Sequence, residues 1–303
     1  MSHLPPDDQV ALRGLAVRAL EALEVVTGEP RLARPNDELI LLSHRQPTDH
    51  LAQLYEPSVC LVLRGAKETS TADRTNTITA GEFLVVSHDM PVVARITEAS
   101  HDAPYVAIIV PLQVEQLVDL QHAARTSPSV GGDRFALRLG TADGKLIDAF
   151  DRYLQALGDP NDADALAPLA LREIHYRLLS SPQGDLLREL ALGERHAEPI
   201  AKAIELLRHD LAARVSVSEV ANHVGLSTSA LHHHFKAVTG TSPVQYQKQL
   251  RLLEARRLIQ SSSQSVADAA YAVGYTSAAQ FSREYRRAFG LPPSRDRVLE
   301  PTR

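Results

Sequence analysis

The sequence has little of what secreted or membrane-spanning proteins need. It contains one cysteine, Cys60, among 303 residues, which excludes an intramolecular disulfide framework and favours a reducing, cytoplasmic compartment. Its apolar runs fall well short of the roughly 20 residues that a membrane-spanning helix needs. The first residues also lack the basic start and apolar core of a secretory leader, and instead mix charged and apolar residues at helical spacing. We therefore expect a protein that acts in the cytoplasm.

An overall excess of basic residues is absent too, since the net charge is −5. The charges are unevenly distributed, however. Residues 198–303 carry 14 Lys and Arg against 9 Asp and Glu, whereas residues 1–197 carry 18 against 28. An acidic front and a basic rear indicate two parts with different roles, and the length suffices for two domains. The basic rear is the candidate for contact with nucleic-acid phosphates.

Residues 39–110 predict a β-rich front part. Short runs of β-branched and aromatic residues are separated by turn sequences such as Arg64-Gly65. These runs cover residues 58–63, 76–79, 83–87, 91–97 and 105–110. Several short strands at this spacing are typical of a sandwich or small barrel. A helix is expected to follow over residues 112–125.

Helical spacing of apolar residues begins near residue 143 and continues to the C-terminus. It predicts helices over residues 143–157, 164–179 and 185–192. Two of these have continuous apolar faces, made of Leu146, Ile147, Phe150, Leu154 and Leu157, and of Leu166, Leu169, Ile174 and Leu178. Such faces would pack on the sheet or form a dimer interface, and both interpretations stay open. A break in the pattern places the domain boundary between residues 195 and 196. The front domain is then 1–195, helical from about 143, and the rear domain is 196–303.

The rear part contains an internal repeat. Val217, Ala221, Val224 and Gly225 correspond to Val266, Ala270, Val273 and Gly274 at an offset of 49 residues. Leu231, Phe235, Gly240 and Pro243 correspond to Phe281, Tyr285, Gly290 and Pro293 at an offset of 50. The second copy therefore has one extra residue between its two halves.

Each copy predicts a helix-turn-helix, over about residues 216–238 and 265–288. A small alanine allows two helices to cross closely, and a glycine four residues later suits the sharp turn between them. Ser227 and Ser277 are candidate N-caps of the second helices, which would leave one face free for the DNA major groove. Residues 244–260 predict a linker helix of roughly 25 Å between the two units.

At this point the sequence resembles a known family. Residues 198–297 are similar to the DNA-binding domain of the AraC/XylS transcription regulators, through the motif AxxVGxxSxxxLxxxFKxxxGxSPxxY, the following RLxxARRLI and the segment SVADAAYAVGYTSAAQFSREYRRAFGLPPSR. The front segments LYEPSVCLVLRGAKE, ITAGEFLVVSHDMPVVARI and PYVAIIV resemble the cupin-like N-terminal domain of one AraC subgroup. The resemblance implies an α+β protein, with a cupin-like β-barrel or sandwich in front and two helix-turn-helix units joined by a linker helix behind.

The resemblance also implies which residues contact DNA. The base-reading positions of the family fall on Ser229, His232 and His233 in the first unit, and on Ala279, Gln280, Ser282 and Arg283 in the second. The phosphate-contact candidates are Thr228, Lys236, Arg286 and Arg287. Gln280 could read adenine and Arg283 guanine, and phosphate contacts would position the protein without specifying sequence. Taken singly, each of these basic residues could equally be an ordinary solubilising charge.

Two arginines of the linker helix, Arg256 and Arg257, match the ARR of the family motif. We expect one of them to hold the two units together through a carboxylate, such as Asp268 or Glu219, rather than to contact DNA.

The front domain is implied to bind an effector or to mediate dimerisation. Candidate pocket residues at inward strand positions are Tyr55, Cys60, Val62, Val85, Arg95 and Tyr105. For each of them an ordinary core or surface role is the competing interpretation. Cys60 is either a small buried hydrophobe or a thiol that senses electrophiles or oxidants, and no basic residue adjoins it in sequence to activate it. No His-x-His pair occurs between residues 39 and 110, so we expect neither metal nor cofactor.

These inferences predict a sequence-specific transcription regulator rather than an enzyme. Its expected partners are double-stranded DNA, a small-molecule effector and a second copy of the chain, with RNA polymerase as a further candidate. Two alternatives stay open: a front domain that only dimerises, and a cupin-type enzyme fused to a DNA-binding domain. The effector, the operator and the direction of regulation are not encoded in any pattern of the sequence.

Overall fold

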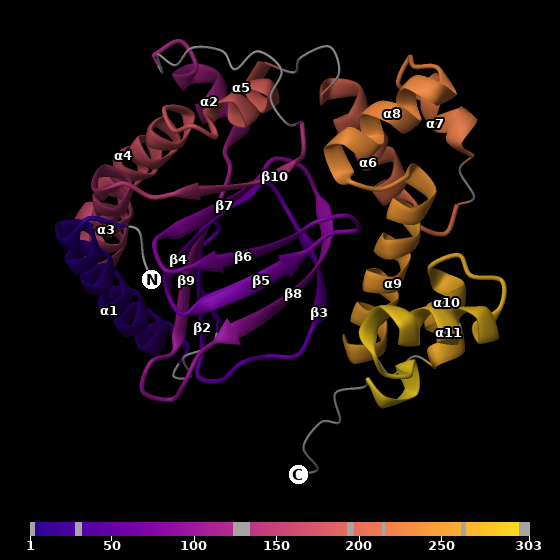
Figure 1. Ribbon diagram of the computed structural model, residues 1–303, viewed down its shortest axis with the longest axis horizontal. Helices are drawn as coiled ribbons and strands as arrows, with labels where there is room; N and C mark the ends of the chain where they lie inside the picture. The colour runs from indigo at the N-terminus through magenta and orange to yellow at the C-terminus, as the bar shows by residue number, and fades with distance from the viewer. Residues whose placement is uncertain are drawn as a thin grey trace.

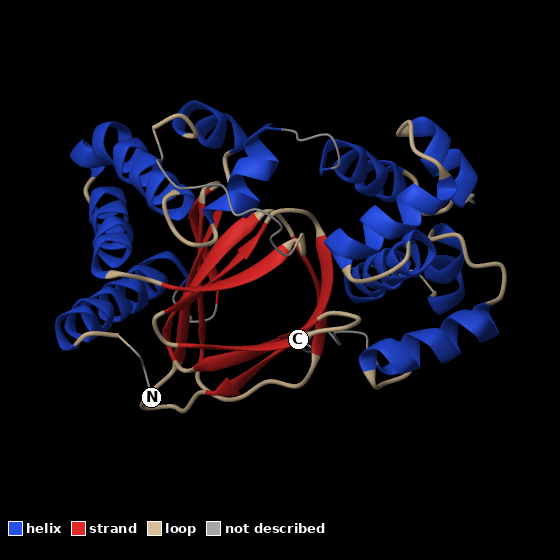
Figure 2. Ribbon diagram, turned by 45° about the horizontal axis from the view of Figure 1, so that its top comes forward, coloured by secondary structure: helices blue, strands red, loops and turns tan. Residues whose placement is uncertain are grey.

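The structure is a computed structural model that describes residues 4–27, 32–123, 134–192, 197–213, 216–261 and 265–296. Its front part is built from two antiparallel β-sheets with helices against one side, and its rear part is a group of helices (Figures 1 and 2). The predicted α+β class is confirmed. The predicted boundary at residues 195 and 196 lies outside the described residues.

The larger sheet has six strands in the order β1-β2-β9-β4-β7-β10. Their bounds are β1 (Leu32–Asn36), β2 (Leu39–His44), β4 (Ser58–Arg64), β7 (Glu82–Val86), β9 (Tyr105–Pro111) and β10 (Leu137–Thr141). The smaller sheet has the order β3-β8-β5-β6. It consists of β3 (Leu51–Tyr55), β5 (Ala66–Ser70), β6 (Thr75–Thr79) and β8 (Met90–Glu98). The five strand predictions fall on β4, β6, β7, β8 and β9, whereas the other five strands had not been predicted individually.

Side chains of the larger sheet alternate between two buried layers. Along β4, Val59 and Leu61 lie in the layer that faces the helices, whereas Cys60 and Val62 face the interior between the sheets. Successive residues of a strand point to opposite faces, so a sheet covered on both sides is apolar at every position. This explains why the sequence of β4 shows no alternation of apolar and polar residues.

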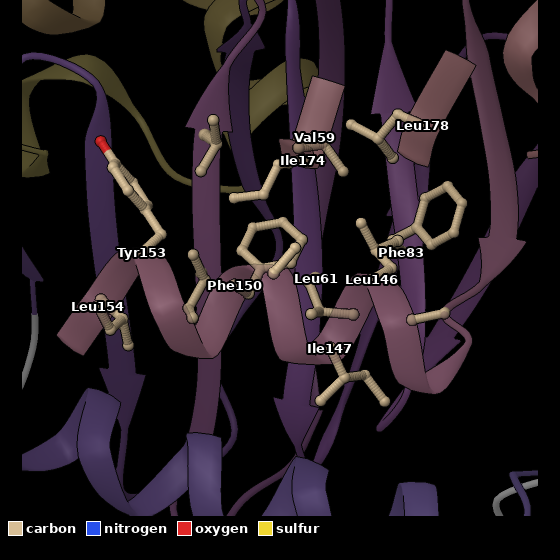
Figure 3. Packing of buried hydrophobic residues seen from close by; sticks show 14 of the residues in the cluster. Val59, Leu61, Phe83, Leu146, Ile147, Phe150, Tyr153, Leu154, Ile174 and Leu178 are labelled. Atoms are coloured by element: carbon tan, nitrogen blue, oxygen red, sulfur yellow. The ribbon is translucent and has the colours of Figure 1, made fainter. Parts of the chain in front are cut away.

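The helices of the front part cover the outer face of the larger sheet. These helices are α1 (Pro6–Thr27), α2 (Val114–Leu120), α3 (Gly144–Gly158), α4 (Pro160–Leu179) and α5 (Gly184–Leu192). Figure 3 shows Phe150 of α3 and Ile174 of α4 between the helices and the sheet, close to Leu61. Most of the two predicted apolar faces therefore pack on the sheet. Leu166 and Leu169 do not, because they are 47% and 63% exposed.

The rear part contains six helices within the described ranges. They are α6 (Ala197–His209), α7 (Val217–His223), α8 (Thr228–Thr239), α9 (Pro243–Ser261), α10 (Val266–Ala272) and α11 (Ala278–Phe289), followed by the short 3₁₀ helix η1 (Pro293–Arg295). The pair α7–α8 and the pair α10–α11 fall on the two predicted helix-turn-helix units. Helix α9 is the predicted linker between them, and Figure 1 shows it joining the two pairs. Helix α6 had not been predicted.

The rear part packs directly on the front part. Strand β3 contacts both α9 and α11, and β8 contacts α9. A backbone hydrogen bond runs from the amide of Ala136 to the carbonyl of Val238 at the end of α8, 2.9 Å away. We call the two sheets of the front part, with the space between them, the barrel. The buried apolar cluster between these sheets continues into α6, α8 and α9. The first helix-turn-helix unit is therefore packed against the front part through buried apolar side chains.

Candidate functional site

The two helix-turn-helix units begin with the same local structure. Ser216 accepts a hydrogen bond from the amide of Glu219, whose carboxylate accepts one from the amide of Ser216. Ser265 and Asp268 form the same reciprocal pair at the start of α10. Such capping boxes satisfy amides that a helix start leaves unpaired. The expectation that one linker arginine pairs with a carboxylate such as Glu219 or Asp268 was wrong, because Arg256 pairs with Asp296 and Arg257 with Glu254.

The turn of each unit depends on a glycine in the left-handed region. Gly225 has φ of +71° and Gly274 has φ of +87°, where residues with a Cβ are strained. After the turns, Ser227 and Ser277 cap α8 and α11 by accepting hydrogen bonds from the amides of Ala230 and Gln280. These predictions of turn and cap are confirmed. The second helices, α8 and α11, start 50 residues apart, whereas the first helices, α7 and α10, start 49 residues apart. The extra residue of the second unit therefore lies in its turn.

Each second helix buries one face and leaves the other open. Leu231 and Phe235 of α8 are fully buried, as are Phe281 and Tyr285 of α11. The base-reading candidates Ser229, His232, His233, Ala279, Gln280 and Arg283 are exposed, and Ser282 is half-buried. The phosphate candidates Thr228, Lys236, Arg286 and Arg287 are exposed as well. The structure thus places both sets of candidates on the accessible faces of two helices of the same kind.

One of the predicted base-reading residues of α11, Gln280, is held by side-chain contacts. Gln280 donates a hydrogen bond to Glu284, 3.3 Å away, and Glu284 pairs with Lys248 of the linker helix at 2.9 Å. Burial alone would raise the pKa of Glu284, but hydrogen bonds from Lys248, Tyr275 and Gln280 lower it below its ordinary value. The carboxylate therefore stays charged and orients Gln280, whereas Arg283 has no such contact among the described residues.

Arg256 of the linker helix makes the contact that was expected of one of the two arginines, but with another carboxylate. Its Nε lies 2.8 Å from Asp296, and its guanidinium lies 4.7 Å from the ring centroid of Phe289. Asp296 also accepts a hydrogen bond of 2.7 Å from Tyr285 of α11. Arg257 instead pairs with Glu254, one turn back in its own helix. Arg256 therefore joins the linker helix to the second unit, not one unit to the other.

A cavity of about 910 Å³ opens between the two sheets and reaches the rear part. Four of the six predicted pocket residues line it: Tyr55, Cys60, Arg95 and Tyr105. Val62 lies in the interior cluster without lining the cavity. The prediction that Val85 lines the cavity was wrong, because its side chain faces the helices on the opposite side of the sheet. Its neighbours Leu84 and Val86 are the cavity residues of β7, since one step along a strand reverses the face.

Lys67 lies inside this cavity and was missed by reasoning along the sequence. It is 6% exposed, and its Nζ donates a hydrogen bond to Sγ of Cys60 at 3.2 Å. Strand β4 belongs to one sheet and β5 to the other, so the turn at Gly65 brings Cys60 and Lys67 face to face. Burial, the largest single influence, lowers the pKa of Lys67, but Cys60, Tyr55 and Tyr105 together outweigh it and hold that pKa well above its ordinary value.

The hydroxyl of Tyr105 is buried beside this pair. Its oxygen has no hydrogen-bond partner among the described residues. Burial raises its pKa above the ordinary value, so the phenol stays protonated. The cavity therefore combines apolar walls with a cation, a thiol and a free hydroxyl at one point.

Arg208 connects the cavity with the rear part. It belongs to α6, lines the cavity, and forms an ion pair with Asp89 between β7 and β8. The backbone carbonyl of Asp89 also accepts a hydrogen bond of 2.7 Å from Tyr246 of the linker helix. Two helices of the rear part thus hold one residue of the barrel.

No three His, Cys, Asp or Glu side chains in the described ranges lie close enough together to hold a metal ion. No described helix is long and apolar enough to cross a membrane.

A front part that encloses a cavity, followed by two helix-turn-helix units, is the architecture of a transcription regulator. Comparison with family models identifies the family. The model of the AraC-type transcriptional regulator N-terminus matches residues 35–186, and a helix-turn-helix domain model matches residues 220–298. The first match spans half of the chain. The chain belongs to the family of AraC-type transcriptional regulators.

Individual relatives agree with this placement. The transcriptional activator RhaS of Klebsiella pneumoniae is 32% identical over 155 residues, which are 48% of this chain and 53% of that protein. The transcriptional regulator ExsA of Pseudomonas aeruginosa is 33% identical over 134 residues, 44% of this chain and 47% of ExsA. The chain thus spans about half the length of the curated relatives it matches.

Solved structures show the same fold. ToxT from Vibrio cholerae has a TM-score of 0.59 and 11% identity, covering 86% of this chain and 97% of ToxT. A second ToxT structure, bound to (E)-4-(8-methylnaphthalen-1-yl)but-3-enoic acid, has a TM-score of 0.54 and 10% identity, with 86% and 98% covered.

Proposed function

We propose that the protein binds specific sites in double-stranded DNA by placing α8 and α11 in successive major grooves, without enzymatic activity of its own. The observation that carries this proposal is the repeated unit itself. Both copies have a capped first helix, a left-handed glycine turn and a second helix with an exposed polar face. A helix of this kind is what the major groove admits.

In this proposal the two reading faces differ. Ser229, His232 and His233 contact bases from α8, and Ala279, Gln280, Ser282 and Arg283 contact bases from α11. Thr228, Lys236, Arg286 and Arg287 contact phosphates. Arg283 is the strongest single reader, because a guanidinium can bind guanine through two hydrogen bonds.

We propose further that a small molecule in the 910 Å³ cavity controls DNA binding. The support is that Arg208 lines the cavity and also forms the ion pair with Asp89 that holds α6 against the barrel. A ligand that displaces or reinforces Arg208 changes how firmly the DNA-binding part is held. ToxT, which has the same fold, has been crystallised with a small organic acid, so the fold can hold a ligand of this size.

A dimer would pair two such proteins along the DNA and raise the effective affinity. We propose α4 as the interface, because Leu166 and Leu169 are exposed on it although the rest of its apolar face is buried. Sedimentation of Leu169→Glu tests this: a dimer dissociates, while Val10→Glu, which alters another exposed apolar residue of the front part, leaves the mass unchanged. We also place the protein in the cytoplasm, with its DNA, and name RNA polymerase as a candidate partner.

The function is tested by selecting genomic DNA fragments with the purified full-length chain. We expect a few fragments that share a sequence with two half-elements, one for each unit. The matched control is a variant in which His233 and Arg283 are both changed to Ala. Enrichment of the same fragments by wild type and this variant, or no enrichment over input, would overturn the proposal.

A further inference from the structure

The only cysteine of the sequence is not an isolated thiol in the folded chain. Sγ of Cys60 lies 3.2 Å from Nζ of Lys67, and both side chains line the cavity. Lys67 also lies over the ring of Tyr55, with Nζ 5.2 Å from the centroid. The sequence alone had argued against a reactive thiol because no basic residue adjoins Cys60 along the chain. The fold provides that residue seven positions away.

A purely structural role does not explain this pair well. An ammonium group removed from water is costly unless a counter-charge or several acceptors satisfy it. Within the described part of the chain, the ammonium of Lys67 donates its hydrogen bond to Sγ of Cys60. A thiol is a weak acceptor, whereas a thiolate carries the missing charge. The contact therefore favours the thiolate, which is the nucleophilic form of cysteine.

The surroundings restrict the class of compound that can react. The walls of the cavity near the pair are apolar, including Leu84, Val86 and Ile109, so an uncharged organic molecule is favoured. A single cysteine has no second thiol with which to form an intramolecular disulfide, so the stable product is an adduct. The free hydroxyl of Tyr105 and the ammonium of Lys67 can both donate a hydrogen bond to a carbonyl oxygen of the bound molecule.

We propose that Cys60 and Lys67 form a covalent binding site for uncharged α,β-unsaturated carbonyl compounds. The sulfur forms a bond to the β-carbon, and the electron pair of the C=C bond moves toward the carbonyl to give an enolate. The α-carbon then takes a proton from the Lys67 ammonium. The products are a thioether and a neutral amine, so atoms and charge balance without an oxidant. This site rests on the effector function proposed above and names its ligand class.

The reaction also changes the electrostatics of the cavity. Before it, a thiolate and an ammonium neutralise each other. Afterwards no anion remains beside Lys67, and burial disfavours its reprotonation. The contact between β4 and β5 at this point is therefore replaced by the adduct, in the same cavity that Arg208 of α6 lines.

The test uses the full-length chain without DNA, so its result does not depend on whether the chain regulates transcription. The probe is cyclohexenone, and saturated cyclohexanone is the matched control that can form a Schiff base but no thioether. Intact mass spectrometry should show one adduct per chain with cyclohexenone and none with cyclohexanone. Peptide mapping should place the adduct on Cys60, and Cys60→Ser should show none. Failure to label the folded protein, or labelling at a lysine or histidine instead, would overturn the site.

The pH dependence of the labelling rate distinguishes a thiol activated by Lys67 from an ordinary thiol. The thiol of a short cysteine peptide with blocked ends, used as the model thiol, has a pKa of about 8.5 and gains roughly 80-fold in thiolate between pH 6 and 8. We expect labelling of the wild type to change less than about threefold over this range, and to exceed the model thiol about tenfold at pH 7. Lys67→Met should restore a steep pH dependence, whereas Lys202→Met, which removes a cation from an exposed position of α6 outside the cavity, should not.

Other titratable groups that line the cavity could also affect the pH dependence of labelling, so they need control variants. His44 lines it, and an imidazole titrates in this pH range, so the profile is repeated with His44→Gln. Tyr105 stays protonated there, because burial raises the pKa of its phenol. Arg95 and Arg208 are paired with Glu68 and Asp89. A wild-type profile that follows the model thiol would overturn the proposal even if the Lys67 variant fails to fold.

Discussion

Arg208 of α6 is bound to Asp89 of the barrel, and this ion pair joins the DNA-binding part to the front part. The Asp89 side chain is 14% exposed and that of Arg208 is 37% exposed, so solvent screens the pair in part. Exposed ion pairs contribute about 0–1 kcal/mol. The position of the pair matters more than its strength, because Arg208 also lines the cavity.

A double-mutant cycle with Asp89→Asn and Arg208→Gln measures this link. The asparagine keeps the backbone carbonyl that Tyr246 binds, so the variant removes only the charge. Urea denaturation followed by circular dichroism should give a coupling of about 0.5–1 kcal/mol between the two changes. A cycle of Arg172 and Asp119, an exposed pair within the front part, is the control. Strict additivity for Asp89 and Arg208 would show that the pair does not hold the two parts together.

Mutations of base-contacting and of phosphate-contacting residues should have different effects on DNA binding. Arg283→Ala should weaken specific binding by about 1–3 kcal/mol, with little effect on non-specific binding. Lys236→Ala should weaken binding to all sequences and lower the salt slope by about one. Fluorescence anisotropy at several salt concentrations measures both quantities.

The matched control for these variants is Lys202→Ala, which removes the same charge from an exposed position of α6. It should change neither specificity nor the salt slope. An Arg283→Ala protein that keeps its full preference for the selected site would refute the assignment of α11 as the main reading helix.

The sequence predicted the rear part better than the front part, and the turn of each unit shows why. Val217 to Gly240 contains the whole first unit, and every decisive feature of it is local: an N-cap, a left-handed glycine and apolar residues three or four positions apart. Helical contacts join residues that are close in the chain, so a pattern can show them. The offset of 50 between Ser227 and Ser277 even located the extra residue of the second turn.

The cavity and the linker contacts could not be predicted in the same way. Strand β7 is buried on both faces, so Val85 and Leu84 look alike in sequence although only Leu84 faces the cavity. Lys67 meets Cys60 only because β4 and β5 belong to different sheets. Asp296 meets Arg256 across 40 residues, whereas the closer candidates were already used as helix caps. These pairings depend on how elements pack, which no local pattern contains.

The buried arginine of the linker helix should matter much more than its neighbour. The side chains of Arg256 and Asp296 are 14% and 9% exposed, and removing one partner of such a pair leaves the other charge buried. Arg256→Met should therefore destabilise the protein by about 3 kcal/mol. Arg257→Met removes only an exposed pair within one helix and should cost about 0.3–0.5 kcal/mol. Urea midpoints compare the two, and equal shifts would contradict the role of Arg256 as the tie between α9 and the second unit.

The two turn glycines should differ in their tolerance of alanine. Both have positive φ, which costs alanine about 1–2 kcal/mol. A Cβ on Gly225 would meet no atom within 4 Å, whereas a Cβ on Gly274 would lie 2.7 Å from the carbonyl oxygen of Ala212. Gly274→Ala should therefore destabilise by about 3 kcal/mol, since overlap with backbone adds to the strain. Urea midpoints again give the comparison, and a larger loss for Gly225→Ala would refute it.

Stability should fall as the medium becomes mildly acidic, in part because of His88. Burial lowers the pKa of this imidazole to about 4, and its Nε2 has no hydrogen-bond partner among the described residues. In the unfolded chain the pKa is about 6.5. Between these values the unfolded chain binds a proton that the folded chain does not. The stability contribution is complete above about pH 6.5 and declines by up to roughly 1.4 kcal/mol per pH unit toward pH 4.

His88→Gln isolates this contribution, because a glutamine cannot take up the proton. Burial lowers the pKa of His175 in the same direction, so the variant should lose only part of the acid sensitivity. Urea midpoints of wild type and variant, measured at several pH values from 4 to 7, should differ by an amount that changes with pH. A constant difference across this range would mean that His88 is protonated alike in the folded and unfolded chain, and that its burial is not maintained in solution.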